Sequence, residues 1–216
     1  MILAKERVAV CEYARRMAAD GLVVGTSGNI SVRSGGLVAV TPTGVDYATM
    51  GPADVVVVSP DGSIVDGKLR PTSELPMHVA VYGSATDPDG RSVAAVVHTH
   101  SVHATAVSTL VDEVPPIHYL VATIGESVRV ARYATYGTPE LAASMLAALE
   151  GRRGCLLANH GTLAYGDTLE AAYHRAQQLE WLCQVWLLAR SAGSPNLLPA
   201  AEISGVVEKL RGYGQG

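Results

Sequence analysis

The stretch SVAAVVHTHSVHATAVS, residues 92–108, carries three histidines close to the end of an apolar run. Its first nine residues are rich in Val and Ala, which indicates a buried strand. Side chains alternate between the two faces of a strand, so His98 and His100 point to the same side, about 6.5 to 7 Å apart. In a helix, His100 and His103 would be the neighbours instead. We favour the strand, in which His98 and His100 can share one metal ion and His103 begins a short helix and points away.

A second apolar run, GCLLANHG (154–161), also ends in a histidine that is followed by glycine. Because ligands bind at strand ends in open α/β sheets, we expect His160 to lie close to the pair. Three neutral imidazoles leave one coordination position open, which is typical of a catalytic metal site. The H-x-H pattern is a weak signal by itself, since two hydrogen-bonded histidines would also produce it. His78, His118 and His174 lack this spacing, and we expect them to be structural or exposed.

One glutamate and three small-residue loops are further candidates for a site. Glu74 lies at the start of a predicted helix, where the helix dipole favours an ionised carboxylate, although helices often begin with such a glutamate. GTSGN (25–29), TPTG (41–44) and PTS (71–73) offer hydroxyls and backbone N–H groups that could hold a phosphate. Each could equally be an ordinary turn, and none has the lysine of a P-loop.

The order of predicted elements indicates an α/β fold. Its 216 residues suit one domain, 1–216, with a full core, and neither repeats nor linkers divide it. We expect helices at 3–19, after a cap at Thr72 or Ser73, from Pro139 to about Gly151, and from Asp167 onward. Buried strands are expected at 54–59, 92–100 and 154–161, with a hairpin within 25–44 and a strand partner after the Asp61-Gly62 turn.

Composition and charge exclude several classes of function. The net charge is −4 with no basic run, which argues against nucleic-acid binding. Apolar runs fall far short of the ~20 residues of a membrane span, and the charged N-terminal stretch does not resemble a signal peptide, so we expect a cytoplasmic protein. Cys11, Cys155 and Cys183 are far apart and odd in number, which predicts buried free thiols.

Several motifs, in order along nearly the whole chain, resemble the class II, metal-dependent aldolases, the superfamily of fuculose-phosphate aldolases and ribulose-phosphate epimerases. The motifs are GTSGNISVR, TPTGVDY, PTSELPMH, HTHSVHATAVS, IHYL, YATYGT, NHGTLAYG and a C-terminal Tyr-Gly. The resemblance implies one domain with a central mixed, largely antiparallel sheet between layers of helices. It also implies reversible cleavage of a ketose 1-phosphate to dihydroxyacetone phosphate and an aldehyde.

The same resemblance implies roles for individual residues. One divalent metal would be bound by His98, His100, His160 and, before substrate arrives, by the acid/base Glu74. Zn²⁺ suits these ligands first, and Mn²⁺, Co²⁺ and Fe²⁺ are alternatives. The phosphate of the sugar would lie against Gly28, Asn29, Thr43, Gly44, Thr72 and Ser73. Three tyrosines would be catalytic: Tyr119 would act on the aldehyde side, Tyr136 would lie in the aldehyde pocket, and Tyr213 matches the tyrosine of the C-terminal tail. The sites would form between the subunits of a homotetramer.

Two departures leave the sugar open. Thr72 replaces the more usual serine before Ser73, and Tyr136 stands where fuculose aldolases carry Phe. A 5-deoxypentulose 1-phosphate is therefore as plausible a substrate as L-fuculose 1-phosphate. Proteins with three other functions share the fold. Two are enzymes, a methylthioribulose-1-phosphate dehydratase and a ribulose-phosphate 4-epimerase, and the third is a non-enzymatic adducin-like scaffold. The intact histidine and glutamate set argues against the scaffold.

Overall fold

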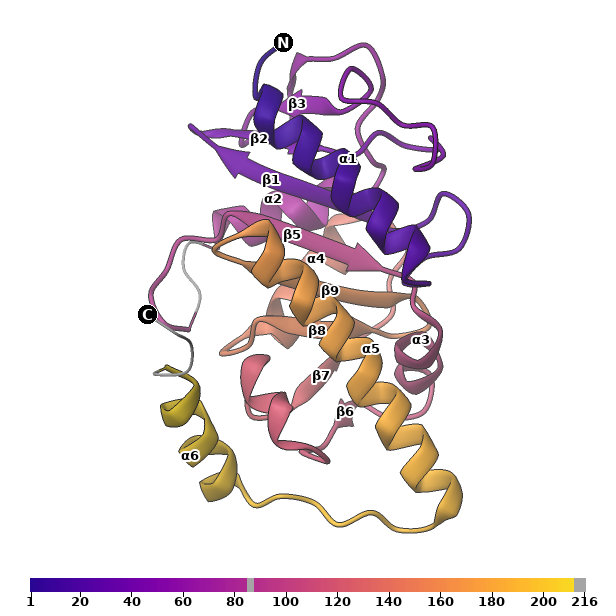
Figure 1. The fold of residues 1–216 in the computed structure, drawn as a ribbon, viewed down its shortest axis with the longest axis vertical. Helices are drawn as coiled ribbons and strands as arrows, with labels where there is room; N and C mark the ends of the chain where they lie inside the picture. The colour runs from indigo at the N-terminus through magenta and orange to yellow at the C-terminus, as the bar shows by residue number, and fades with distance from the viewer. Residues whose placement is uncertain (85–87, 212–216) are drawn as a thin grey trace.

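A nine-stranded sheet organises the computed structural model, which describes residues 1–84 and 88–211 (Figure 1). The strand order is β4-β3-β2-β1-β5-β9-β8-β7-β6, and only the β7–β8 pair is parallel. The sheet is thus mixed and mostly antiparallel, as expected. Its strands are β1 (Asn29–Ser34), β2 (Leu37–Val40), β3 (Val56–Val58), β4 (Ile64–Asp66), β5 (Ala95–Thr99), β6 (Glu113–Val114), β7 (Val128–Ala131), β8 (Gly154–Leu157) and β9 (Gly161–Gly166).

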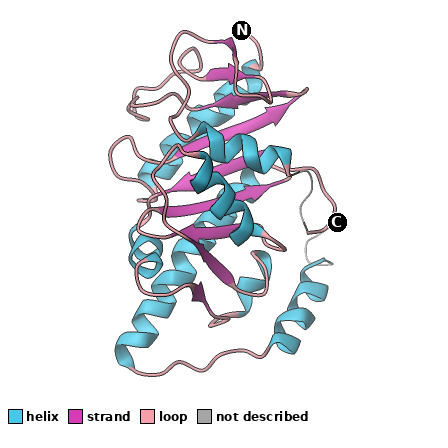
Figure 2. Cartoon of the chain, turned by 180° about the vertical axis from the view of Figure 1, so that it is seen from behind, coloured by secondary structure: helices cyan, strands magenta, loops and turns pink. Residues whose placement is uncertain are grey.

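Helices cover both faces of the sheet (Figures 1 and 2). On one face lie α1 (Ala4–Ala19), α3 (Val102–Ser108) and α5 (Leu169–Ala192); on the other lie α2 (Leu75–Gly83) and α4 (Pro139–Leu149). The 3₁₀ helix η1 (Tyr119–Thr123) packs against α6 (Ala200–Arg211). None of the helices in the described part of the chain is both long and apolar enough to cross a membrane.

Alternating strand residues divide the core into two hydrophobic clusters. In β5, Val97 packs with the α1 and α5 side, whereas Val96 packs with α2 and α4, together with Met77 and Met145. His98 follows Val97 and therefore points to the same face as Val96, toward α2. The alternation of side chains along β5 thus directs His98 toward α2, the helix that begins directly after Glu74.

Most helix predictions are confirmed. The helix expected at 3–19 is α1, and α4 starts at Pro139, with the Thr138 hydroxyl accepting a hydrogen bond from Leu141 N at 3.3 Å. The cap predicted for α2 is wrong, because Glu74 itself occupies the N-cap position and makes no side-chain cap bond. The Thr72 hydroxyl instead accepts from Glu74 N at 3.2 Å, which turns the chain before the helix and leaves the carboxylate free for the histidines.

One strand prediction needs a correction. The apolar run at 154–161 is not a single strand, because β8 ends at Leu157 and residues 158–160 form a turn. The following GTLAYG segment is β9, which lies between β5 and β8 and which its mixed composition did not reveal. His160 therefore lies in a hairpin turn and not at the end of a strand.

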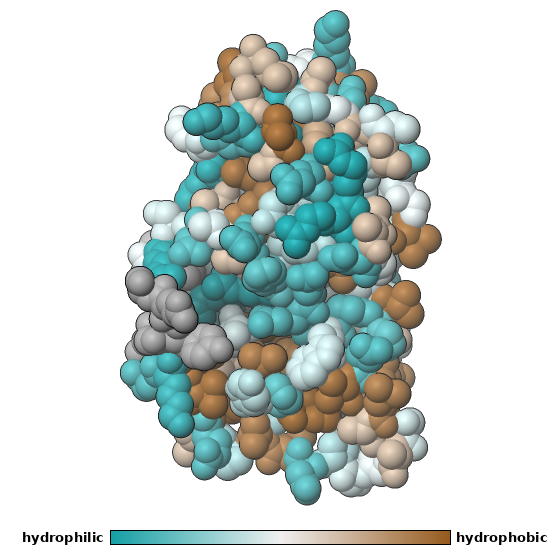
Figure 3. Space-filling view, in the orientation of Figure 1, coloured by the Kyte–Doolittle hydropathy of each residue, from teal (hydrophilic) through white to brown (hydrophobic). Residues whose placement is uncertain are grey.

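The surface separates polar from apolar side chains. In the orientation of Figure 1, hydrophilic residues cover the middle of the visible face, and hydrophobic residues gather in its lower half (Figure 3). A groove on the molecule is lined by apolar side chains that include Leu110, Trp186, Leu187 and Leu197. Two of these side chains are largely exposed, Leu110 at 62% and Leu197 at 50%.

Candidate metal centre and phosphate pocket

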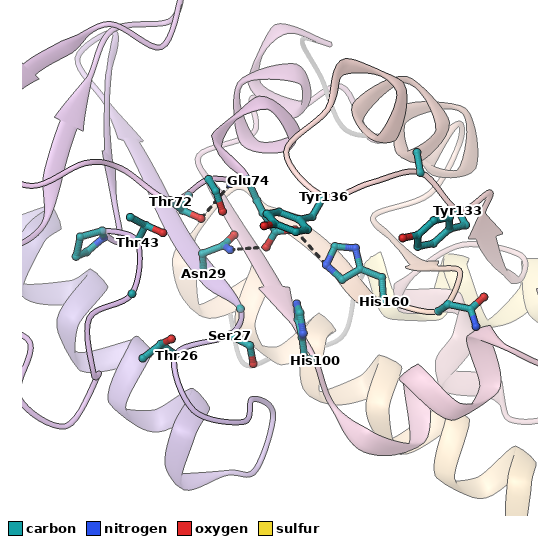
Figure 4. A pocket seen from close by; sticks show the side chains of 16 residues that line it. Thr26, Ser27, Asn29, Thr43, Thr72, Glu74, His100, Tyr133, Tyr136 and His160 are labelled. Atoms are coloured by element: carbon teal, nitrogen blue, oxygen red, sulfur yellow. Dashed lines mark hydrogen bonds and ion pairs between the residues drawn. The ribbon is translucent and has the colours of Figure 1, made fainter.

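Three histidines converge where β1, β5 and the β8–β9 turn meet. His98 is completely buried in β5, His100 follows the end of that strand, and His160 comes from the turn. Their ring centroids lie 4.8 to 4.9 Å apart. With one oxygen of Glu74, their ligand atoms all lie within 4.8 Å of one another. Figure 4 shows three of these four residues, Glu74, His100 and His160. The structure therefore brings together the four residues that the sequence singled out.

Glycine allows this close approach. A Cβ on Gly161 would lie 2.1 Å from the carbonyl oxygen of Thr99, so no side chain fits between the turn and β5. Gly28, with φ of +71°, is similarly restricted, because its Cβ would lie 2.8 Å from the carbonyl oxygen of His98. Both glycines hold neighbouring backbone close to the histidines.

Glu74 bridges two of the histidines. Its Oε2 lies 3.0 Å from His98 Nε2, and its Oε1 lies 3.1 Å from His160 Nε2. Asn29, the cross-strand partner of His98, donates from Nδ2 to Oε2 at 2.9 Å. Burial opposes ionisation of Glu74, but His98 and His160 outweigh it through charge and hydrogen bonding and hold its pKa well below the usual range. The carboxylate is therefore an anion at neutral pH.

The donor set fits a divalent metal. His98 Nδ1 lies 2.7 Å from the carbonyl oxygen of Thr162 and must donate to it, which leaves Nε2 to face the other histidines. Burial and the adjacent His98 and His160 lower the pKa of His100 to about 3, so its ring is neutral. Burial also opposes a charge on His98, but the negative charge of Glu74 outweighs it and raises the pKa of His98; the same negative charge would stabilise a metal cation bound in place of the proton. Apart from the ion-pair contact with His160 Nε2 at 3.1 Å, the buried Glu74 Oε1 has no hydrogen-bond partner among the described residues, as expected of an atom that binds an ion.

A cavity of about 330 Å³ opens beside these groups (Figure 4). Its walls include all six residues that were expected to hold phosphate, which are Gly28, Asn29, Thr43, Gly44, Thr72 and Ser73. Among the described residues, no lysine or arginine lines this cavity. Any anion there would be held by hydroxyls and backbone N–H groups, together with whatever cation the histidines bind.

The loops around the cavity are tied to one another. Tyr47, in TPTGVDY, is buried, and its hydroxyl donates to the carbonyl oxygen of Gly28. Burial raises the pKa of Tyr47 to about 12, so it stays a donor. A Cβ on Gly137 would lie 2.6 Å from the carbonyl oxygen of Ser73, so the loop that carries Tyr136 packs directly on the PTS loop. Tyr47 and Gly137 therefore hold the loops of the cavity in place, and we assign neither of them a role in the reaction.

The structure separates the three predicted tyrosines. Tyr136 lines the cavity and is 63% exposed, whereas Tyr119 is 49% exposed and does not line it. Tyr213 lies outside the described residues. The lining residues that were not singled out include Tyr133 in YATYGT and Asn159 beside His160. Both lie within quoted motifs, and the positive φ of Asn159, +55°, is the kind of backbone feature found at functional turns.

The other histidines lie apart from the cluster. His103 Nδ1 lies 2.6 Å from Glu180, which also accepts from the backbone N–H of His103 and Ala104, as expected for a residue of the next helix. His118 caps η1, and His174 is exposed. His78 is fully buried and hydrogen-bonded to Asn29, so it is structural but connected to the site.

Known proteins resemble this chain over its whole length. The family described as class II aldolase and adducin N-terminal domain matches residues 8–187. A 5-deoxy-D-ribulose 1-phosphate aldolase of Bacillus thuringiensis is 40% identical, with all of both chains covered. An L-fuculose phosphate aldolase of Escherichia coli is 39% identical over 98% of this chain and 95% of its own. A solved structure of L-fuculose 1-phosphate aldolase superposes with a TM-score of 0.92 at 36% identity and covers 98% of both chains.

The matched residues run from within α1 to within α5 and so include Glu74 and the three histidines, and the solved relative covers 98% of the chain. The chain belongs to the class II aldolase and adducin N-terminal domain family.

Proposed function

We propose that the protein is a metal-dependent aldolase that reversibly cleaves a ketose 1-phosphate to dihydroxyacetone phosphate and an aldehyde. The observation that carries the proposal is the convergence of Glu74, His98, His100 and His160 beside a cavity lined with hydroxyls and glycine backbone that could hold a phosphate. Relatives named as aldolases of such sugars, at 39 to 40% identity, support it.

Three imidazoles and one carboxylate would bind the metal, and we propose Zn²⁺, with Mn²⁺, Co²⁺ or Fe²⁺ as ions that the same ligands accept. A bound divalent ion would act as a Lewis acid toward the substrate oxygens and stabilise the negative charge of the enediolate. No Schiff-base lysine is then required. The chain has only Lys5, Lys68 and Lys209, and none of them lines the cavity.

The phosphate group would enter between the GTSGN, TPTG and PTS loops. Thr43, Thr72 and Ser73 offer hydroxyls, and the backbone of Gly28 and Gly44 is open to an anion because neither residue has a side chain. This binding would fix the position of the sugar relative to Glu74 and the histidines, so that binding energy is used for orientation.

Glu74 would move the proton at the reacting carbon. In cleavage, the C4 hydroxyl loses its proton, the C3–C4 bond breaks, and its electron pair remains on C3 as the enediolate. Glu74, which is ionised before the reaction, takes up one proton that balances the proton lost from the C4 hydroxyl, and delivers it to C3. In the direction of synthesis it removes the same proton. Tyr119 would exchange the proton of the aldehyde oxygen, while Tyr136 and Tyr213 would contact the aldehyde.

A 5-deoxypentulose 1-phosphate is the substrate that we propose first, and L-fuculose 1-phosphate the second. Relatives from Bacillus thuringiensis and Rhodospirillum rubrum, at 40% and 39% identity, carry names that include 5-deoxyribulose 1-phosphate. A panel of ketose 1-phosphates should be assayed with coupled detection of dihydroxyacetone phosphate. Release of that product supports the proposal. Loss of water from methylthioribulose 1-phosphate, without dihydroxyacetone phosphate from any sugar, would refute it.

We propose that four copies form a cytoplasmic homotetramer in which Tyr119 serves a neighbouring cavity. Its position outside the cavity of its own chain and the apolar groove near Trp186 support this arrangement. Cys11, Cys155 and Cys183 are buried and free, which suits a reducing compartment. Light scattering should give a tetramer mass. Mixed tetramers of Glu74→Gln and Tyr119→Phe chains should regain part of the activity that each variant lacks, and no recovery would refute the shared site.

A further inference from the structure

A buried ladder of polar side chains joins helix α2 to strand β1 and ends on Glu74. Glu74, His78 and Tyr82 are four residues apart, so they share one side of the helix at intervals of about 6 Å. Asn29 and Ser31 are two residues apart on β1, so they share one face at an interval of about 6.6 Å. Because these intervals nearly match, the two sets of side chains interdigitate.

Hydrogen bonds connect every step of the ladder. Asn29 Nδ2 lies 2.9 Å from Glu74 Oε2, and Asn29 Oδ1 lies 2.5 Å from His78 Nε2. On the other side of the imidazole, His78 Nδ1 lies 2.7 Å from Ser31 Oγ, which lies 2.7 Å from the Tyr82 hydroxyl. All four residues beyond Glu74 are at most 7% exposed. A fully paired polar network of this kind orients its members strongly.

Glu74 sets the direction of each bond. An ionised carboxylate only accepts hydrogen bonds, so Asn29 must present its NH₂ group to Glu74 and its oxygen to His78. His78 must then carry its proton on Nε2. Burial, with the charge of His98 nearby, lowers the pKa of His78 to about 3, so the ring is neutral and Nδ1 is an acceptor. Ser31 therefore donates to His78, and Tyr82 donates to Ser31.

From this ladder we propose that His78 is a positioning residue for the reaction, because it fixes the Asn29 amide that holds Glu74 Oε2. The inference rests on the proposed aldolase function. The amide of Asn29 does not pass protons readily, so the ladder orients the carboxylate and does not supply its proton. With Oε2 held, Oε1 stays directed at His160 and at the space that the other imidazoles face.

Two substitutions at position 78 separate positioning from folding. The amide nitrogen of glutamine can take the place of Nε2, so His78→Gln keeps the donor to Asn29, whereas the shorter side chain in His78→Asn reaches only the place of Nδ1, beside Ser31. We expect His78→Gln to keep most of the wild-type kcat. His78→Asn should lose about 10- to 100-fold in kcat, the scale of a catalytic group displaced by about 1 Å, with little change in KM. Tyr82→Phe is the matched control, because it removes only the far end of the ladder and should leave kcat near wild type.

A measurement on the unaltered protein does not depend on how the variants fold. Ring ¹⁵N chemical shifts of His78 in the metal-free and the zinc-loaded protein should show a proton on Nε2 and none on Nδ1. A proton on Nδ1, or equal kcat values for the Gln and Asn variants, would overturn the proposal. If the wild-type protein cleaved no ketose 1-phosphate, the proposed function would fail, whereas the His78 tautomer would still decide whether the ladder has the assigned direction.

Discussion

Replacement of Glu74 by glutamine tests the proposed proton transfer directly. Glutamine has nearly the size of glutamate and keeps an oxygen that can accept from Asn29 Nδ2, now 2.9 Å from Oε2. It cannot take up or release a proton at neutral pH. Loss of a positioned acid/base lowers a rate by about 10²- to 10⁴-fold. At 1.36 kcal/mol for each factor of ten, this equals about 2.7 to 5.4 kcal/mol in the activation barrier.

Binding should survive this change. His98, His100 and His160 remain as ligands, and the substitution removes none of the hydroxyls and backbone N–H groups that are expected to bind phosphate. Bound metal and the affinity for inorganic phosphate should therefore stay close to wild type. Steady-state cleavage with coupled detection of dihydroxyacetone phosphate, metal analysis and phosphate titration calorimetry measure the three quantities. Turnover within a few-fold of wild type, in a variant that retains its metal, would remove Glu74 from the proton-transfer step.

Glu180→Gln is the matched control for that experiment. Glu180 is also a part-buried glutamate beside a histidine, His103, but it does not line the cavity. The same change of charge there should lower stability and leave most of the turnover. If both variants lost kcat equally, the loss at position 74 would reflect a general effect of charge and not proton transfer.

Further predictions concern the metal, the turn and stability against pH. His98→Ala should lose bound metal, and full occupancy in this variant would refute the proposed ligand set. Gly161→Ala should destabilise the protein by about 1–3 kcal/mol or more, because its Cβ would lie 2.1 Å from Thr99 O; an unchanged melting temperature would refute this. Burial opposes ionisation of Glu180, but hydrogen bonds from Ala104 and His103 outweigh it and lower its pKa. Its stabilisation is therefore present above the unfolded pKa and is lost as pH falls through the folded pKa. Glu180→Gln should cost about 1–3 kcal/mol at neutral pH and less in acid, and a constant difference in denaturant unfolding would contradict this.

Local patterns predicted much of the fold. The alternation of β5 identified His98 and His100 as a pair, and the punctuation by Thr138 and Pro139 located α4. They failed at GTLAYG, because β9 is central in the sheet yet contains glycine, threonine and tyrosine among its apolar residues. The helix cap before α2 was also wrong, since a carboxylate that binds histidines cannot be recognised from the sequence of its own helix.

Local sequence patterns could not predict the hydrogen bonds that orient Glu74. Asn29 was predicted only as a phosphate-binding residue, and His78 as a structural or exposed one. Yet they join Glu74 to β1 through hydrogen bonds between residues 45 and 49 positions apart. No periodicity within either segment indicates that they meet. The match between the four-residue repeat of α2 and the two-residue repeat of β1 becomes visible only when the two elements lie side by side.

The strand order explains why one carboxylate can serve all these partners. β5 lies between β1 and β9, so its His98 has Asn29 on one neighbouring strand and Leu163, three residues after His160, on the other. Helix α2 begins beside β1 and β5, so the Glu74 side chain at its N-terminus can contact both Asn29 of β1 and His160 of the β8–β9 turn. Because the two antiparallel neighbours fix the register of β5, a slip of one residue would turn His98 away from Glu74 toward the α1 and α5 core. The candidate metal centre therefore depends on the same backbone pairing that forms the middle of the sheet.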